Sequence, residues 1–204
     1  MTQILINGDA QAPNRVLLAH GAGAGMDHAV MVALAEGLGD EHIQVVRFEF
    51  PYMQKTREDG RKRPPDRESV LLAHWRALAA EFAHPRLFLA GKSMGGRMAS
   101  LVADELAPKG LILLGFPFHP PGKPERFRGQ HLATMATPTL LLQGERDTFG
   151  NRQDVANVDL AETVQPCWVN DGDHSFMPRK SSGFTQEQNL TAVVARMRSF
   201  ILAQ

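Results

Sequence analysis

The stretch Arg86-Leu-Phe-Leu-Ala-Gly-Lys-Ser-Met-Gly-Gly96 decides which fold the sequence predicts. Its first half is an apolar run typical of a buried strand, and its second half matches the pattern G-x-S-x-G around Ser93. A helical pattern follows over Met94–Leu106. A sharp turn between a strand and a helix strains its serine, needs small residues two positions away, and presents the hydroxyl at the end of the strand. The stretch therefore predicts a reactive serine at a strand-to-helix turn.

Short apolar runs alternate with longer helical patterns along the rest of the chain. Parallel strands buried on both faces read as nearly unbroken apolar runs, and their alternation with helices is typical of βαβ units. We therefore predict an α/β fold, a mostly parallel sheet sandwiched by helices, in a single domain over residues 1–204. Pro166 indicates that the last strand lies at an edge. The expected strands are Arg15–Ala19, Ile43–Phe48, Arg86–Ala90, Gly110–Leu114, Pro138–Leu142 and Val164–Val169, and the expected helices are Ala29–Leu38, Asp66–Phe82, Met94–Leu106 and Gln186–Leu202.

The composition argues against several classes of function. Lys plus Arg and Asp plus Glu each number 22, so the chain lacks the basic excess that binding to nucleic acid or to a membrane surface requires. Cys167 is the single cysteine, which excludes an intramolecular disulfide and a cysteine-rich zinc site. Residues 1–8 show no secretory signal, and no apolar run approaches the roughly 18 residues that span a bilayer. We expect a cytoplasmic protein.

A serine becomes a strong nucleophile only beside an imidazole base that a carboxylate orients. In a site built on this kind of turn, the order along the chain is serine, acid, histidine. His174 is the predicted base, because it lies between the last predicted strand and the last predicted helix. His119 and His131 precede the Pro138–Leu142 strand and therefore come too early.

Asp147 is the predicted acid, because it lies in the turn after the strand over Pro138–Leu142. Glu145 in the same turn is its competitor, whereas Asp171 and Asp173 are expected to form the turn near the histidine. The 27-residue separation of Asp147 and His174 leaves room for one helix and one strand. Such a connection would return both side chains to the same edge of the sheet.

An oxyanion formed by attack on a carbonyl needs two backbone N–H donors. Met94, directly after the serine, is one predicted donor, and the other is expected in the loop His20-Gly-Ala-Gly-Ala-Gly25. Ala22 is the preferred donor in this loop and Gly23 the next, because small residues let the backbone approach a substrate. His20 is predicted to hold the loop rather than to act as a second base.

Two nucleotide-binding patterns can be tested by counting. A phosphate-binding loop of the form G-x-x-x-x-G-K-[ST] ending at Ser93 would need glycine where the chain has Arg86. A dinucleotide fingerprint G-x-G-x-x-G starting at Gly21 would need glycine where the chain has Met26. We therefore expect no nucleotide. A serine nucleophile with an imidazole base requires no metal and no organic cofactor, and we expect neither.

These motifs resemble the α/β-hydrolase superfamily, and the resemblance runs from Val16 to Phe200. The loop at 20–25 and the turn at 91–96 are most similar to its small, cap-less, dienelactone-hydrolase-like branch, although dienelactone hydrolases carry a cysteine where this chain has Ser93. The resemblance implies an α/β-hydrolase fold without a cap domain. It also implies a serine hydrolase that cleaves carboxylic ester or thioester bonds of a small acyl substrate, with Ser93 as nucleophile, Asp147 as acid and His174 as base.

Other uses of the same fold stay open. One alternative is a non-catalytic scaffold or binding module, since some relatives in this branch are subunits of larger assemblies. Another is a peptidase or an acyltransferase that uses the same three residues with a different leaving group or acceptor. The sequence determines neither the physiological substrate nor the oligomeric state.

Two long segments lie outside the predicted elements. Tyr52–Pro65 carries the basic cluster Arg57–Arg63, for which a solvated charge run is favoured over a site for an anionic substrate. Phe116–Ala136 has room for one short helix but not for a substrate-selective lid, so we expect an open, shallow site. Asp27-His28 and Phe48–Met53 are expected to line or brace that site.

Overall fold

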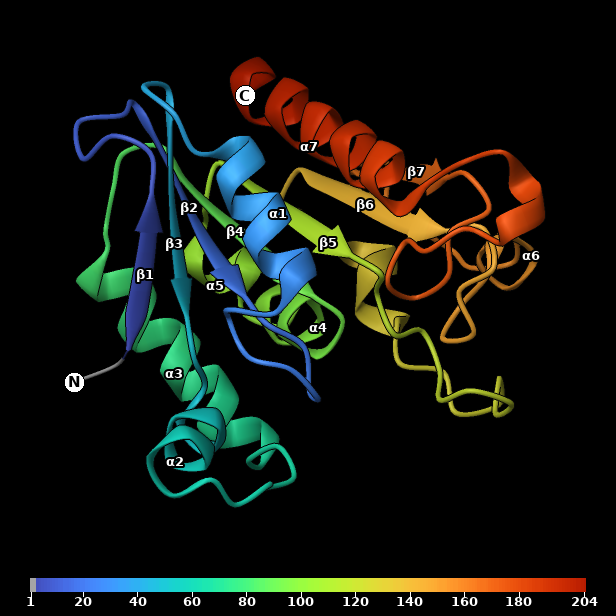
Figure 1. Cartoon of the computed structure of the whole chain (residues 1–204), viewed down its shortest axis with the longest axis horizontal. Coiled ribbons are helices and arrows are strands. Elements are labelled where there is room, and N and C mark those ends of the chain that lie inside the picture. Colours follow the sequence, from blue (N-terminus) through green and yellow to red (C-terminus); the bar gives the residue numbers. More distant parts are fainter. Residues whose placement is uncertain (1–2) are drawn as a thin grey trace.

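The computed structural model describes residues 3–204, and its centre is a seven-stranded sheet sandwiched between helices (Figure 1). The strand order is β1-β3-β2-β4-β5-β6-β7, and every neighbouring pair is parallel except β1 with β3. This arrangement confirms the predicted α/β fold. The strands are β1 (Ile4–Asn7), β2 (Asn14–Ala19), β3 (Ile43–Phe48), β4 (Leu87–Lys92), β5 (Gly110–Leu114), β6 (Thr139–Gly144) and β7 (Val164–Val169).

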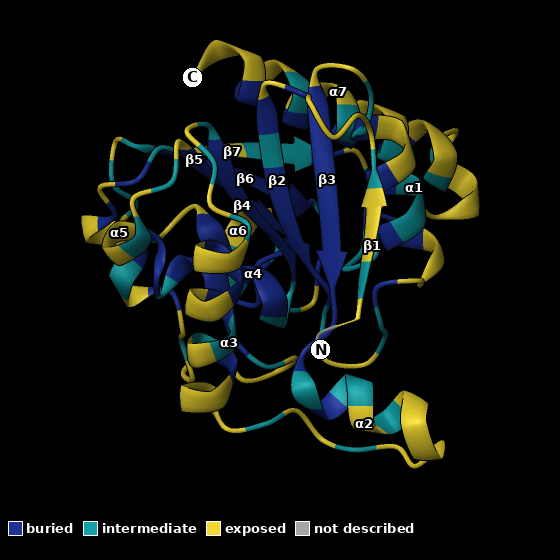
Figure 2. Ribbon diagram, turned by 90° about the vertical axis from the view of Figure 1, so that its left-hand side faces the viewer, coloured by how far each residue is buried: buried dark blue, intermediate teal, exposed yellow. Residues whose placement is uncertain are grey.

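Helices cover both faces of the sheet (Figure 1). α1 (Ala29–Leu38) and α7 (Gln186–Ala203) pack side by side on one face, and α3 (Glu68–Glu81) and α4 (Met94–Ser100) pack against the other. Figure 2 shows that the central strands are buried, whereas the helices keep an exposed outer side. The remaining helical segments are α2 (Pro51–Asp59), α5 (Ala103–Leu106), α6 (Arg152–Val155) and the 3-10 helices η1 (Gln130–Thr134) and η2 (Lys180–Ser182).

The sheet separates two apolar cores. Leu17 of β2 and Leu89 of β4 pack with Trp75 of α3 in one core. Their neighbours in sequence, Leu18 and Phe88, point to the other face and pack in the core below α1 and α7. Successive side chains of each strand therefore enter opposite cores, which explains why the strand sequences read as unbroken apolar runs.

The two edges of the sheet differ in how well the sequence predicts them. β1 was not expected, because it pairs antiparallel at an edge and leaves Leu5 and Ile6 exposed, so its apolar residues carry little core signal. At the other edge, β7 carries Pro166 and, among the described strands, pairs with β6 alone. The proline therefore marks an edge strand, as predicted.

Two predicted segments differ from the structure. The loop expected over Tyr52–Pro65 is wrong in its first half: Pro51, whose fixed φ suits the first turn of a helix, begins α2, and Gly60 ends it with a φ of 71°. The single helix expected over Met94–Leu106 is divided into α4 and α5. Val102 interrupts it, because its φ of −119° lies outside the helical range.

The predicted site residues lie at the carboxyl-terminal ends of the parallel strands, which is a different border of the sheet from the edge strands β1 and β7. Between β5 and β6 the described chain forms only η1 and irregular backbone, so no cap domain covers these ends. The loops after β2, β4, β6 and β7 meet there, as expected for the carboxyl ends of parallel strands. Across residues 3–204, none of the helices combines the length and apolar character needed to span a bilayer.

Candidate active site

Ser93 lies at the strand-to-helix turn that the motif predicts, because β4 ends at Lys92 and α4 begins at Met94. Its backbone has a φ of 52° and a ψ of −118°, a strained combination for a residue with a side chain. The turn also needs a glycine two positions later. A Cβ on Gly95 would overlap the carbonyl oxygen of His20 and lie 2.8 Å from the Cβ of Ala19.

Ser93, His174 and Asp147 form one chain of hydrogen bonds. The Nε2 atom of His174 lies 2.8 Å from the Oγ atom of Ser93, and its Nδ1 atom lies 2.8 Å from the Oδ2 atom of Asp147. Asp147 comes from the turn after β6 and His174 from the loop after β7, two neighbouring parallel strands. The structure thus brings together three side chains that are far apart in the sequence.

The Asp147 carboxylate is fully buried and accepts hydrogen bonds on both oxygens. Its Oδ1 atom accepts the backbone N–H of Phe149 at 2.8 Å, and its Oδ2 atom accepts the Gln143 amide at 3.0 Å as well as His174. The phenyl ring of Phe149 packs beside the imidazole, with ring centroids 4.3 Å apart. A carboxylate on Nδ1 keeps the proton there, so Nε2 presents its lone pair to the serine hydroxyl.

The loop His20–Gly25 is held by side chains from a distant segment. Burial lowers the pKa of the His20 imidazole and favours its neutral form. Its Nε2 atom accepts the backbone N–H of Phe50 at 3.1 Å, so Nδ1 carries the proton and donates to the Gly21 carbonyl at 2.6 Å. The Tyr52 hydroxyl donates to the carbonyl of Ala22 at 3.0 Å and of Gly21 at 3.2 Å. His20 therefore braces the loop.

Arg57 of α2 joins the end of β3 to the turn before α1. Its guanidinium donates to Glu49, whose side chain is fully buried, and to Asp27, with shortest distances of 2.6 Å in both cases. The hydrogen bond from Arg57 lowers the pKa of the Asp27 carboxyl. Glu49 also accepts the backbone N–H of Met26 at 3.3 Å. This network fixes the point where the loop at 20–25 enters α1.

The chain matches a family described as an alpha/beta hydrolase domain over residues 12–202. The chain belongs to the alpha/beta hydrolase family. The matched region runs from the start of β2 into α7, so it includes all three hydrogen-bonded residues, Ser93, Asp147 and His174.

Solved structures with the fold of this hydrolase come from several bacteria. An alpha-beta serine hydrolase homologue from Coxiella burnetii has a TM-score of 0.65 at 18% identity, covering 99% of this chain and 90% of that one. The esterase domain of a Rhodothermus marinus protein has a TM-score of 0.68 at 17% identity, over 98% and 90%. XC6422 from Xanthomonas campestris, described as an a/b serine hydrolase without lid, has a TM-score of 0.62 at 18% identity, over 99% and 88%. At these identities the likeness shows the fold, and the dienelactone-hydrolase-like placement stays a prediction.

The other candidate side chains of the hydrolase have different partners. Glu145, the competitor for the acid, accepts the backbone N–H of Asp171 at 2.9 Å and pairs with Arg152. In the basic cluster, Arg57 pairs with Glu49 and Arg63 pairs with Asp59. These ion pairs support a structural role for the two arginines over substrate binding. The remaining contacts are those of His119 with Asp154, His131 with Ser100, Arg63 with Asp59, and Asp173 with the backbone N–H groups of Ser175 and Met177.

A cavity of about 300 Å³ lies beside Ser93 and His174. The loop Gly21–Ala24, which contains the predicted donors Ala22 and Gly23, lines it together with the first turn of α1 and Phe149. Met94, the other predicted donor, is the first residue of α4 and directly follows the serine. Within residues 3–204, no group of three or more His, Cys, Asp or Glu side chains is placed to hold a metal ion.

Sequence patterns did not single out Lys92, Gln143 or Phe149. Lys92 occupies a variable position of the G-x-S-x-G motif, is 9% exposed and lines the cavity. Burial lowers the pKa of its amine to about 8, and the nearby carboxylate of Asp147 opposes that shift. A charged residue at the end of an apolar strand is the signal that could have pointed to it.

Proposed function

We propose that this hydrolase cleaves carboxylic ester or thioester bonds of a small substrate through an acyl-enzyme on Ser93. The observation that carries the proposal is the chain of hydrogen bonds from the Ser93 hydroxyl through His174 to Asp147. This arrangement activates a serine hydroxyl for attack on a carbonyl carbon. Serine hydrolases and an esterase domain are also among the structures that share the fold.

Acylation begins when the Ser93 oxygen attacks the carbonyl carbon and His174 takes the hydroxyl proton at Nε2. Asp147 keeps the imidazole in its orientation and stabilises the imidazolium that forms. The backbone N–H groups of Met94 and Ala22, with Gly23 as the alternative to Ala22, bind the oxyanion. His174 then gives its proton to the departing alcohol or thiol, which leaves the acyl group on Ser93.

Deacylation uses the same groups with water in place of the alcohol or thiol. His174 takes a proton from water, whose oxygen attacks the acyl carbon, and then returns that proton to Ser93 as the acid is released. The cavity of about 300 Å³ and the absence of a cap over the described sheet edge suit a small or protruding acyl group.

The substitution Ser93→Ala tests the proposal. We expect kcat for p-nitrophenyl acetate to fall by about 10⁴-fold to 10⁶-fold while the protein stays folded, because the nucleophile is lost but the residue stays small. Ser181→Ala is the matched control, because it removes an exposed serine in η2, outside the site. This control should keep wild-type kcat, KM and circular dichroism.

A fluorophosphonate probe gives an independent readout of the same serine. We expect it to label the wild-type protein and Ser181→Ala covalently at Ser93, and to leave Ser93→Ala unlabelled. Normal ester turnover by Ser93→Ala would overturn the assignment of the nucleophile. A folded wild-type protein that neither reacts with the probe nor hydrolyses esters or thioesters would instead favour the non-catalytic scaffold.

A further inference from the structure

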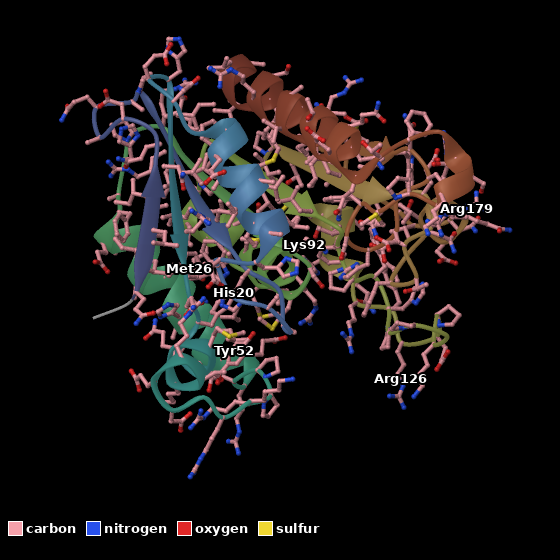
Figure 3. All side chains as sticks on the ribbon, in the orientation of Figure 1. His20, Met26, Tyr52, Lys92, Arg126 and Arg179 are labelled. Carbon is pink, nitrogen blue, oxygen red and sulfur yellow. The ribbon has the colours of Figure 1, made fainter. Side chains whose placement is uncertain are left out.

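Lys92 lines the cavity and directly precedes the proposed nucleophile. It is the last residue of β4 and lies on the same side of that strand as Phe88 and Ala90, which face α1 and α7. The side chain is 9% exposed, and the residue lines the cavity together with Ser93 and His174. Figure 3 shows Lys92 beside the end of α1 at which that helix begins.

The Lys92 amine makes no hydrogen bond or ion pair among residues 3–204. It lies 5.9 Å from the centroid of the Phe176 ring, a cation–π distance, and the charges of Asp147 and Asp173 also act on it. Asp147 already accepts hydrogen bonds from Gln143, His174 and the backbone, and Asp173 accepts two backbone N–H groups. Among residues 3–204, the fully buried side-chain nitrogen atoms without a hydrogen-bond partner belong to Arg47, Trp75 and Arg97, so the Nζ atom of Lys92 keeps access to solvent and a ligand can reach it.

The space next to the amine is kept open by a glycine. Gly115 follows β5 and has a φ of 61°, a conformation that favours glycine. A Cβ at this position would lie 3.0 Å from the Nζ atom of Lys92 and 3.4 Å from the Oδ2 atom of Asp147. The amine is therefore close to the Asp147 end of the site without touching its carboxylate.

The cavity attracts negative charge. No Asp or Glu is among its lining residues, whose titratable members are His28, Lys92 and His174. The ten-residue helix α1 begins at the same cavity, with His28 as its cap and no acidic residue in its first turn. The positive end of that helix and the amine therefore act on the same volume.

We propose that the Lys92 ammonium group binds a carboxylate carried by the acyl part of the substrate, so that the preferred substrates are small esters or thioesters of dicarboxylic acids. The inference rests on the proposed function. We place this carboxylate on the acyl part of the substrate because the acyl part becomes attached to Ser93, the residue next to Lys92. It therefore stays at the cavity that Lys92 lines. A charge-assisted hydrogen bond to this carboxylate would supply the acceptor that the amine lacks within the chain.

A pair of matched esters tests the proposal. Mono-p-nitrophenyl adipate and p-nitrophenyl hexanoate share a six-carbon acyl chain and the same leaving group, and only the first carries a terminal carboxylate. We expect wild-type kcat/KM to be higher for the adipate ester, and the ratio of the two kcat/KM values to fall by about tenfold or more in Lys92→Met. Methionine keeps the length of the chain and removes the charge.

Lys109→Met is the matched control, because Lys109 is exposed and lies just before β5, at the opposite end of that strand from the site. This variant should keep the wild-type ratio. If Lys92→Met lowers kcat/KM equally for both esters, Lys92 acts by balancing the charge of Asp147, and the proposal is overturned. If the wild-type enzyme hydrolyses neither ester, the proposed function itself fails, which is a different result.

The pH dependence of the ratio is a second readout. The charged and titratable groups facing Lys92 are Asp147, Asp173, His174 and His28, from the loops after β6 and β7 and from the start of α1. These groups are the same in Lys92→Met, so any pH dependence that they cause should remain in the ratio of that variant, and the part that disappears belongs to the amine. The wild-type preference for the adipate ester should decline between about pH 6.5 and about pH 9.5 as the amine loses its proton. A wild-type ratio that is constant over this range would contradict the proposal.

Discussion

The turn around Ser93 and the loop His20–Gly25 both line the cavity, but they are held in different ways. The turn is stabilised locally, because Gly91 and Gly96, on either side of Ser93, have no side chains and let the end of β4 pack closely against the start of α4. The loop has no such local support and depends on His20, Phe50 and Tyr52, whose segments are about 30 residues apart. A short motif can therefore encode the turn, whereas only the packed fold can hold the loop.

Among the substitutions that test how the turn and the loop are held, Gly95→Ala has the largest expected effect, because Gly95 is where the two regions touch. An added Cβ would overlap the carbonyl oxygen of His20, which is backbone and cannot turn aside. We expect the free energy of unfolding to fall by about 3 kcal/mol and kcat to fall by about 100-fold, as the loop is displaced from the serine. Urea denaturation and p-nitrophenyl ester kinetics measure the two effects.

Gly23→Ala is the stability control for this substitution. No atom lies within 4 Å of a Cβ built on Gly23, so the free energy of unfolding should stay within about 0.5 kcal/mol of the wild-type value. Equal losses of stability in the two variants would show that the contact between the turn and the loop is unimportant. Crowding around the Cβ position of Gly95 would then not explain the loss of stability.

A smaller effect is expected from Tyr52→Phe, which removes a single oxygen from the support of the loop. The carbonyl groups of Gly21 and Ala22 would lose that donor, and the neighbouring N–H groups would be held less firmly. We expect kcat to fall about tenfold with KM unchanged, and the free energy of unfolding to fall by about 1 kcal/mol. An unchanged kcat beside the loss of stability would mean that Tyr52 supports the fold but not the oxyanion site.

The smallest effect concerns the pH dependence of the free energy of unfolding, to which His20 of the loop contributes. Burial lowers the pKa of His20 in the folded protein, so the unfolded chain binds the proton more readily. The contribution of His20 to stability is full above its unfolded pKa of about 6.5 and is lost as the pH falls toward the lowered folded value. We expect the free energy of unfolding to decline between about pH 7 and about pH 5, by less than about 1.4 kcal/mol per pH unit for this group.

His20→Gln checks the origin of that decline. The slope of unfolding free energy against pH should be shallower in the variant, although His74 and His131, whose pKa values burial also lowers, keep part of it. Urea midpoints across the pH range measure the slope. Identical slopes in the two proteins would show that His20 titrates alike when folded and unfolded.

The sequence predicts the main lines of the fold and of the site because both follow from parallel strands. Unbroken apolar runs locate the central strands, and parallel strands place their carboxyl ends at one edge. From this it follows that side chains after β4, β6 and β7 lie near one another, and Ser93, Asp147 and His174 do so. The strand β1 and the helix α2 escaped prediction, since one is half-exposed and the other is short and largely polar.

The amino-acid sequence by itself determined the strained turn at Ser93, because everything the turn needs lies within a few residues of the serine: a strand before it, a helix after it and glycines on both sides. It also determined the order of serine, acid and histidine along the chain. Only the tertiary structure decided which residues lie beside these groups: Gln143 and Phe149 beside Asp147, Tyr52 under the loop, and Lys92 beside the cavity. Those roles depend on which side chains share a buried volume, and burial is set by the packing of segments distant in sequence, for which no local pattern exists.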